Sequence, residues 1–280
     1  MKTFTSTVLL LILAFTTNAQ TIYSKAFGNP EDKAIIFLHG GPGYNCANFE
    51  FTTAQHLSDS GFYVIVYDRR GEGRSLDKDV QFTFDETFSD LNKLYKKYNV
   101  NKATLLGHSF GGIVATLFAE KHPEKINSLA LLATPISLQR TFKTIINTSK
   151  EIYTVKNDQN SLNYITMLEN MDSTSLLYSS YSFMHAMENK FYSPKIISPE
   201  AREVYNSINR SDEAKTYSMQ MTTEAPQGFW TNEQYTTIDL TNNIKSLLTQ
   251  KMKIYGVYGK DDGLYSKAQI NGSVVHLLIP

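Results

Sequence analysis

The sequence predicts an α/β fold built on a doubly wound, mostly parallel β-sheet. Two continuous apolar runs, residues 34–38 (AIIFL) and 62–67 (FYVIVY), are typical of strands buried on both faces of a sheet. Segments with helical spacing separate such runs throughout the first half of the chain. This alternation predicts parallel strands whose crossover helices cover both faces of the sheet.

The remaining elements of the first half follow the same rhythm. The stretch 48–60 mixes polar and apolar residues and ends at Gly61, as a helix with a C-terminal glycine does. Large apolar residues recur at helical spacing between positions 88 and 98, so one face of a helix packs on the sheet. We expect further strands at 103–106 and 126–133, with a helix at 113–121 between them.

The strand rhythm stops after position 134 and returns near position 253. The intervening stretch is rich in Ser, Thr, Asn, Tyr and Met and has a helical character, which predicts a helical cap over the carboxyl edge of the sheet. Strand patterns reappear at 253–258 and 273–279. The predicted organisation is a signal peptide at 1–19, a core at 20–134 and 244–280, and a cap at 135–243.

The first residues have the pattern of a secretory signal. Lys2 precedes an apolar run at 8–15, and Ala19 offers a small residue for cleavage. The run is too short to span a bilayer as a helix, so the mature chain is expected to have no membrane span and to be secreted or periplasmic. Cys46 is the single cysteine, which excludes an intramolecular disulfide, and we expect it to be a small loop or core residue.

The charge balance points away from polyanionic partners. The chain carries 27 basic and 27 acidic side chains, so no basic excess is available for nucleic acid. No metal-ligand cluster and no phosphate-binding loop is recognisable, and we therefore expect no metal and no cofactor. The expected partner is a small-molecule or peptide substrate, and the sequence indicates no particular oligomeric state.

The strongest chemical motif is GHSFG at 107–111. It follows an expected strand and precedes an expected helix, where a sharp turn projects the oxygen of Ser109 above the sheet. The flanking glycines leave room for that turn. The amide of Phe110, at the start of the helix, can donate to an oxyanion. We therefore predict Ser109 as a nucleophile and Phe110 as one oxyanion-hole donor.

A second glycine-rich motif, HGGPG at 39–43, directly follows the AIIFL strand. Glycines there allow backbone amides to approach a ligand oxygen closely. We expect the Gly41 amide to supply the second oxyanion-hole donor and Gly40 to shape the loop. His39 precedes the turn and is expected to be a structural hydrogen-bonding residue and not a base.

HGGPG, the segment DRRGEGRS at 68–75 and GHSFGG at 107–112 together resemble the α/β-hydrolase superfamily, in particular its proline iminopeptidase-like branch. The resemblance implies a serine hydrolase that works through an acyl-enzyme, with release of N-terminal residues as the first expectation. It also implies a structural role for the 68–75 loop. Phe110 stands where that branch commonly has Trp, which weakens the substrate assignment and leaves an esterase or lactonase as an alternative. A member that only binds a ligand is a further alternative, because no catalytic histidine is recognised in the sequence.

The resemblance also selects the catalytic acid. In this fold the acid follows the penultimate strand, here the strand at 253–258. The family pattern of glycine, two residues and then aspartate, counted from Gly259, selects Asp262, and Asp261 is the alternative one position earlier. Glu169, Glu188 and Glu224 of the cap could hold a substrate amine, but none of them is assigned that role.

The catalytic base is harder to place. The base of this fold lies in the loop after the last strand, whereas His276 falls inside the last expected strand and is expected to be structural. His108 is expected to be buried beside the elbow. His56, His122 and His185 fit no better. We therefore expect the sequence to stop short of the base-bearing segment and this 280-residue chain to have low activity.

Overall fold

The structure is a computed structural model that describes residues 22–76, 79–271 and 275–279. Within this part of the chain, seven strands form one sheet in the order β1-β3-β2-β4-β5-β6-β7. β1 pairs antiparallel with β3, and every other neighbouring pair is parallel. The strands are β1 (Ser24–Phe27), β2 (Lys33–Leu38), β3 (Phe62–Tyr67), β4 (Ala103–His108), β5 (Ile126–Leu132), β6 (Ile254–Gly259) and β7 (Val275–Ile279).

The central strands are apolar throughout because both faces of the sheet are covered. In β3, Ile65 and Tyr67 belong to one core cluster, while Val64 and Val66 belong to another. Successive side chains of a strand point to opposite faces, so a strand covered on both sides needs apolar residues at every position. The doubly wound architecture expected from the sequence is confirmed.

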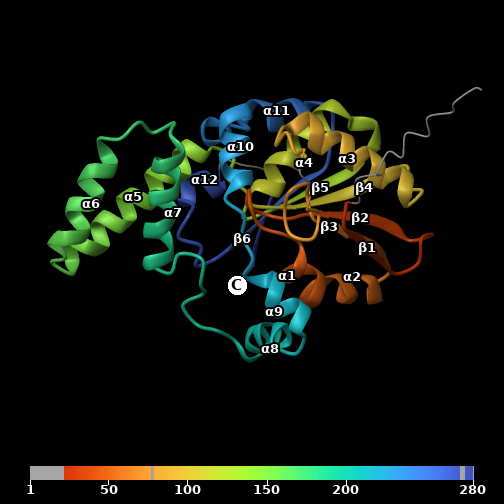
Figure 1. Cartoon of the computed structure of the whole chain (residues 1–280), viewed down its shortest axis with the longest axis horizontal. Coiled ribbons are helices and arrows are strands. Elements are labelled where there is room, and N and C mark those ends of the chain that lie inside the picture. The colour runs from red at the N-terminus through yellow and green to blue at the C-terminus, as the bar shows by residue number, and fades with distance from the viewer. Residues whose placement is uncertain (1–21, 77–78, 272–274, 280) are drawn as a thin grey trace, which may run out of the picture.

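Helices lie on both faces of the sheet (Figure 1). α3, α4, α10 and α11 lie on one side, and α1, α2, α8 and α9 lie on the other, while α5, α6 and α7 form a lobe beyond one end of the sheet. The helices are α1 (Ala47–Phe49), π-helix η1 (Glu50–Ala54), α2 (Gln55–Asp59), α3 (Phe84–Lys97), α4 (Phe110–Lys121), η2 (Pro123–Lys125), α5 (Leu138–Val155), α6 (Gln159–Glu169), α7 (Leu176–Glu188), α8 (Pro199–Ile208), α9 (Asp212–Ser218), α10 (Glu224–Glu233), η3 (Tyr235–Thr237), α11 (Thr241–Thr249) and α12 (Lys267–Asn271).

The insertion between β5 and β6 is helical, but its helices are distributed around the sheet. α5 packs with α6 and α7, whereas α9 packs against α1 and α11 packs against α4. The predicted boundaries of the cap stay predictions. No helix within the described ranges is both long and apolar enough for a membrane crossing.

Candidate active site

The carboxyl end of β4 turns sharply into α4 at Ser109. Ser109 has φ 51° and ψ −120°, a conformation that costs a non-glycine residue strain energy, and it serves as the N-cap of α4. Its N–H donates to Leu132 O at 2.9 Å, and its carbonyl accepts from Gly112 N–H at 2.9 Å. Both bonds hold the turn, so the strained geometry is built into the fold.

Glycine is required on both sides of the serine because the backbone is crowded there. A Cβ at Gly107 would lie 2.5 Å from the Cα of Gly112. A Cβ at Gly111 would overlap the carbonyl oxygen of Leu38, at the end of β2. These close backbone contacts explain why glycine lies two residues before and two residues after Ser109: the elbow packs directly on the neighbouring strand.

Ser109 and Asp262 line the same cavity, of about 300 Å³, although they are far apart in the sequence. Ser109 comes from the β4–α4 elbow, and Asp262 comes from the loop after β6. The cavity is lined by His108, Ser109, Ala133, Phe191, Tyr192, Ser193, Pro194, Ile196, Gly259, Lys260, Asp261, Asp262 and Leu264. The fold therefore brings the predicted nucleophile and the predicted acid to one site.

The two candidate acids have different surroundings. Oδ2 of Asp261 accepts from the backbone N–H of Lys195 at 3.1 Å, so Asp261 holds the segment between α7 and α8. Oδ1 of Asp262 accepts a local hydrogen bond from Leu264 N–H at 3.0 Å. Burial raises the pKa of Asp262 to about 6, although the Leu264 hydrogen bond opposes the shift. These contacts favour Asp262 as the acid.

His108 is exposed to solvent, so the expectation that it is buried beside the elbow is wrong. The strand ends at this residue, and its ring faces the cavity and Gly40 instead of the sheet interior. Although the ring reaches the cavity surface, the protein packed around it still desolvates the imidazole and lowers its pKa below the usual range. Among the side chains that the structure describes, no histidine makes a hydrogen bond with Ser109 Oγ. His276 lies within β7, as predicted, paired with Gly256.

The expected oxyanion-hole residues lie next to Ser109. Phe110 is the first residue of α4, so its N–H precedes the helical hydrogen bonds and lies at the positive end of the helix. Gly40 packs on the elbow, since a Cβ there would lie 3.3 Å from Ser109 Cβ. Gly41 follows with φ 121°, a conformation suited to glycine. Neither Gly41 nor Phe110 belongs to the lining of the cavity, so their roles as donors stay predictions.

The HGGPG loop is held by hydrogen bonds to a buried ion pair, Arg69 and Glu72, of the 68–75 loop. The Arg69 guanidinium donates to His39 O at 2.5 Å and Gly40 O at 2.6 Å, and its Nη2 lies 2.8 Å from Glu72 Oε2. Glu72 also accepts a hydrogen bond from Gly43 N–H. Burial raises the pKa of Glu72 to about 7, against the opposing effect of Arg69.

His39 is part of the same network and has no contact that would make it a base. Its Nε2 accepts from Arg69 N–H at 3.0 Å, so Nδ1 carries the proton and donates to Gly40 O at 2.8 Å. Burial, followed by the charge of Arg69, lowers the pKa of His39 well below its usual range. The imidazole is therefore neutral, and its contacts are structural, as expected.

The rest of the 68–75 loop is held by buried carboxylates. Asp68 accepts from Arg74 Nε at 2.8 Å and from Cys46 N–H at 2.8 Å. Arg70 makes a two-pronged pair with Asp90 of α3, at 2.9 and 2.6 Å. Cys46 is fully buried, and desolvation raises the pKa of its thiol well above the usual range. The Cys46 thiol is therefore protonated and packed, which agrees with the expected core position.

The cavity wall contains residues that the sequence did not single out. Phe191, Tyr192, Pro194 and Ile196 come from the segment between α7 and α8. The carbonyl of Phe191 accepts from Gly263 N–H at 3.1 Å, which fixes this segment to the acid loop. The aromatic residues and proline of 191–194 are the one sequence signal that could have marked it.

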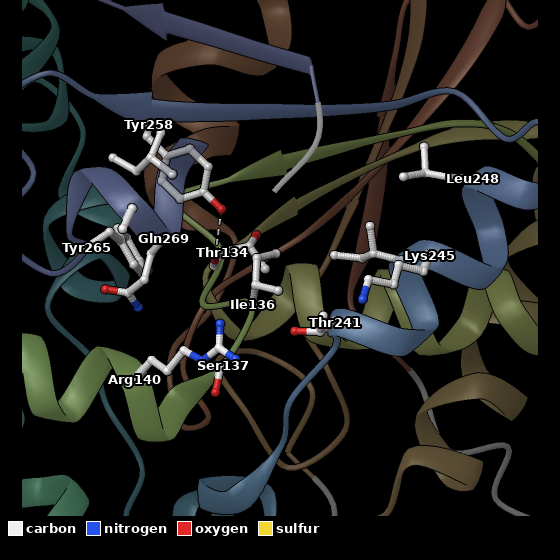
Figure 2. Close-up of a pocket in the computed structure, with 13 residues that line it drawn as sticks. Thr134, Ile136, Ser137, Arg140, Thr241, Lys245, Leu248, Tyr258, Tyr265 and Gln269 are labelled. Carbon is white, nitrogen blue, oxygen red and sulfur yellow. Dashed lines mark hydrogen bonds between the residues drawn. The ribbon is translucent and has the colours of Figure 1, made fainter. Parts of the chain in front are cut away.

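The turn after β5, which borders Ser109, is held by two buried tyrosines. Tyr258 Oη donates to Thr134 O at 2.8 Å, drawn as a dashed line in Figure 2, and Tyr265 Oη donates to Ala133 O at 2.5 Å. Ala133 has φ 42° and lines the Ser109 cavity. Figure 2 shows a separate, smaller cavity of about 130 Å³ behind this turn, which contains neither Ser109 nor Asp262 in its lining.

Comparison with known proteins agrees with this geometry. Residues 33–273 match the model of the family described as the alpha/beta hydrolase fold, so the chain belongs to the α/β hydrolase fold family. A segment of 118 residues is 30% identical to the proline iminopeptidase of Xylella fastidiosa, covering 41% of this chain and 36% of that protein. The matches span about a third of the length of such curated relatives.

Two solved structures show the same fold at low sequence identity. A proline iminopeptidase-related protein from Thermus thermophilus is 21% identical, with a TM-score of 0.58, over 88% of this chain and 79% of that one. A carboxylesterase structure from Nitrososphaera gargenis is 20% identical, with a TM-score of 0.55, over 94% and 88% of the two chains. In the described residues no group of three or more His, Cys, Asp or Glu side chains could hold a metal ion.

Proposed function

We propose that this chain is a serine hydrolase that cleaves an amide or ester bond through an acyl-enzyme intermediate. The observation that carries the proposal is the strained elbow that places Ser109 in the same cavity as Asp262. A strained nucleophile turn at the carboxyl edge of a parallel sheet is the geometry that this chemistry uses.

In the proposed reaction Ser109 Oγ attacks the substrate carbonyl carbon and gives its proton to a histidine base. The carbonyl electron pair moves to the oxygen, where the Gly41 and Phe110 amides stabilise the negative charge. Collapse of the tetrahedral species expels the amine or alcohol, which takes the proton from the base. Water then attacks the acyl-enzyme in the same way. Asp262 orients the base and stabilises its charged form.

The first candidate for the activity is an aminopeptidase of the proline iminopeptidase type. It is supported by the HGGPG and DRRGEGRS motifs and by the names of relatives that match part of this chain.

The second candidate is an esterase or lactonase, and it is favoured by the wall of the cavity. None of Glu169, Glu188 or Glu224 belongs to the described lining, which instead presents Phe191, Tyr192 and Ile196. These three side chains offer apolar contacts to an acyl group, although Lys260, Asp261 and Asp262 also line the cavity. Chromogenic aminoacyl amides and acyl esters, assayed side by side, separate the two candidates: turnover of the amides supports the aminopeptidase, and turnover of the esters without turnover of the amides supports the esterase or lactonase.

A fluorophosphonate probe tests the nucleophile. We expect the parent chain to be labelled and Ser109→Ala to lose labelling while its circular dichroism spectrum stays unchanged. Ser193→Ala is the matched control, because Ser193 lines the same cavity. Persistent labelling of Ser109→Ala would show that another residue is the nucleophile. An unlabelled parent chain would favour a family member that only binds its ligand.

A further inference from the structure

We propose that Arg69 is a positioning residue of the oxyanion hole: it fixes and polarises the Gly40–Gly41 peptide so that the Gly41 N–H faces the substrate oxygen. The inference rests on the proposed serine hydrolase function. It assigns a task to one arginine of the 68–75 loop, a segment for which the sequence indicates only a structural role.

Two donors share the carbonyl oxygen of Gly40. Gly40 O accepts from Arg69 Nη2 at 2.6 Å and from His39 Nδ1 at 2.8 Å. A carbonyl oxygen has two lone pairs, so both are used. The bond from the guanidinium is charge-assisted, which makes it shorter and stronger than a neutral hydrogen bond.

The other end of the same peptide unit is the N–H of Gly41. The carbonyl of Gly40 and the N–H of Gly41 belong to one planar amide, and in a trans peptide they point in opposite directions. Holding Gly40 O toward Arg69 therefore holds Gly41 N–H away from Arg69. Gly40 itself packs on the Ser109 side chain, so this loop borders the elbow.

The bond from Arg69 also polarises the Gly40–Gly41 amide. The positive guanidinium beside the carbonyl oxygen draws electron density from the amide nitrogen. Hydrogen bonds linked through one amide therefore strengthen each other, by roughly 10–30% per bond. The Gly41 N–H thus becomes a better donor. The arrangement needs no movement when charge develops on the substrate oxygen, and such preorganisation is the source of oxyanion-hole stabilisation.

Glu72 keeps the guanidinium in place. It accepts from Arg69 Nε at 3.3 Å and Nη2 at 2.8 Å, and both side chains are almost completely buried. The Cζ atom of Arg69 also lies over the ring of Phe110, 5.2 Å from the ring centroid, in a cation–π contact. One side chain therefore contacts both segments that are expected to provide oxyanion donors.

The test compares Arg69→Lys with Arg70→Lys. Arg70 is the adjacent residue and is also buried, but its guanidinium is paired with Asp90 of α3. Lysine keeps the positive charge but lacks the planar guanidinium with its several N–H donors. In Arg69→Lys the carbonyls of His39 and Gly40 therefore cannot both keep the hydrogen bonds that Arg69 donates. Tm and circular dichroism establish that each variant is folded.

The first readout is the rate at which a fluorophosphonate labels Ser109. This reaction joins Ser109 Oγ to phosphorus, expels fluoride and releases the serine proton, and it develops charge on the phosphoryl oxygen. We expect the labelling rate to be about tenfold slower in Arg69→Lys. This is less than the loss expected when an oxyanion-hole donor is removed altogether, about 10²–10³-fold. With a turned-over substrate, kcat falls and KM stays within about twofold. An Arg69→Lys rate equal to the parent rate, or an equal loss in Arg70→Lys, overturns the proposal.

The second readout does not depend on turnover. In ¹³C- and ¹⁵N-labelled protein, the Gly40 carbonyl signal should move upfield in Arg69→Lys and stay in place in Arg70→Lys. An unmoved Gly40 carbonyl in Arg69→Lys overturns the positioning role. If the Gly40 carbonyl signal moves in Arg69→Lys but the fluorophosphonate does not react with Ser109 of the parent chain, the positioning of the peptide is supported and only the proposed hydrolase function is contradicted.

Discussion

Gly111 lies directly against Leu38, with no space for a side chain between the elbow helix and the end of β2. The atom that a Cβ at position 111 would meet is backbone oxygen, which cannot rotate away. Gly111→Ala should therefore destabilise the fold by about 2–4 kcal/mol, at the high end of overpacking effects. Urea denaturation followed by circular dichroism measures the change.

Gly259→Ala provides the control for that experiment. Gly259 also lies at the carboxyl edge of the sheet, but a Cβ at this position would have Asp262 Cβ as its nearest heavy atom, at 3.7 Å, an ordinary contact. We expect a change within about 0.5 kcal/mol. Equal effects at positions 111 and 259 would contradict the steric explanation of the elbow.

The strain at Ser109 can be measured by comparing two substitutions. Glycine adopts φ 51° and ψ −120° without a steric penalty, whereas alanine does not. Ser109→Gly should therefore be more stable than Ser109→Ala by about 1 kcal/mol, even though glycine loses more entropy on folding. Ser193 does not have a positive φ, so at this position the alanine variant should be more stable than the glycine variant. The same order at both positions would indicate an unstrained elbow.

Asp262 makes the stability of the chain depend on pH in a defined direction. Its pKa rises from 3.8 to about 6 on folding because burial disfavours the charged carboxylate. The folded state then binds the proton more tightly, so stability decreases as pH rises from about 4 to about 6 and is level above that range. Asp262→Asn should be more stable than the parent chain at pH 8, on the order of 2 kcal/mol, with no gain below pH 4.

Activity should respond to the same substitution in the opposite way. In a form of the enzyme that carries the histidine base, loss of the acid should lower kcat by about 10³-fold or more, and the parent activity should fall as pH drops through about 6. Asp261→Asn should have a smaller effect on kcat, because Asp261 is occupied with the backbone of Lys195. A larger loss in Asp261→Asn would move the acid one position earlier.

The buried pair of Arg70 and Asp90 should contribute to stability without taking part in the chemistry. Arg70→Met leaves the Asp90 carboxylate buried without its two-pronged partner and should cost about 3–5 kcal/mol. The double variant Arg70→Met/Asp90→Leu should recover most of this loss, since the buried Asp90 charge is removed and its other partner, Lys93, is mostly exposed to solvent. A thermal denaturation series of the single and double variants tests this, and additive losses would contradict it.

We propose that the chain is exported, which rests on residues 1–19 and lies outside the described structure. Signal cleavage after Ala19 would leave Gln20 as the first residue. Intact-mass spectrometry of protein recovered from a periplasmic or secreted fraction should give the mass of residues 20–280. Recovery of the chain with Met1 from the cytoplasm alone would contradict export.

The strands and the elbow can be predicted because their signals are local. Strands such as β3 are apolar at every position since both faces are covered, and the crowding at Gly107 and Gly111 leaves a glycine signature beside the serine. β1 has no comparable signal, because this edge strand is short and only partly buried.

The surroundings of the site depend on contacts between distant segments, which no local pattern encodes. Tyr192 lines the cavity because the segment after α7 returns to the loop after β6. The exposure of His108 does not follow from the sequence for a related reason: the strand ends there, so the alternation of buried and exposed positions no longer applies. The helical character of the insertion is recognisable, whereas the surfaces its helices cover are not.

The hydrogen bonds from Gly263 to Phe191 and from Lys195 to Asp261 join the wall of the cavity to the acid loop at two points. An outward swing of residues 191–195 would have to break both bonds or carry the Asp262 loop with it. The easier motion is rotation of the Tyr192 ring, which is half-exposed and changes neither bond. Any backbone opening of this wall is therefore tied to the position of the loop that carries Asp262.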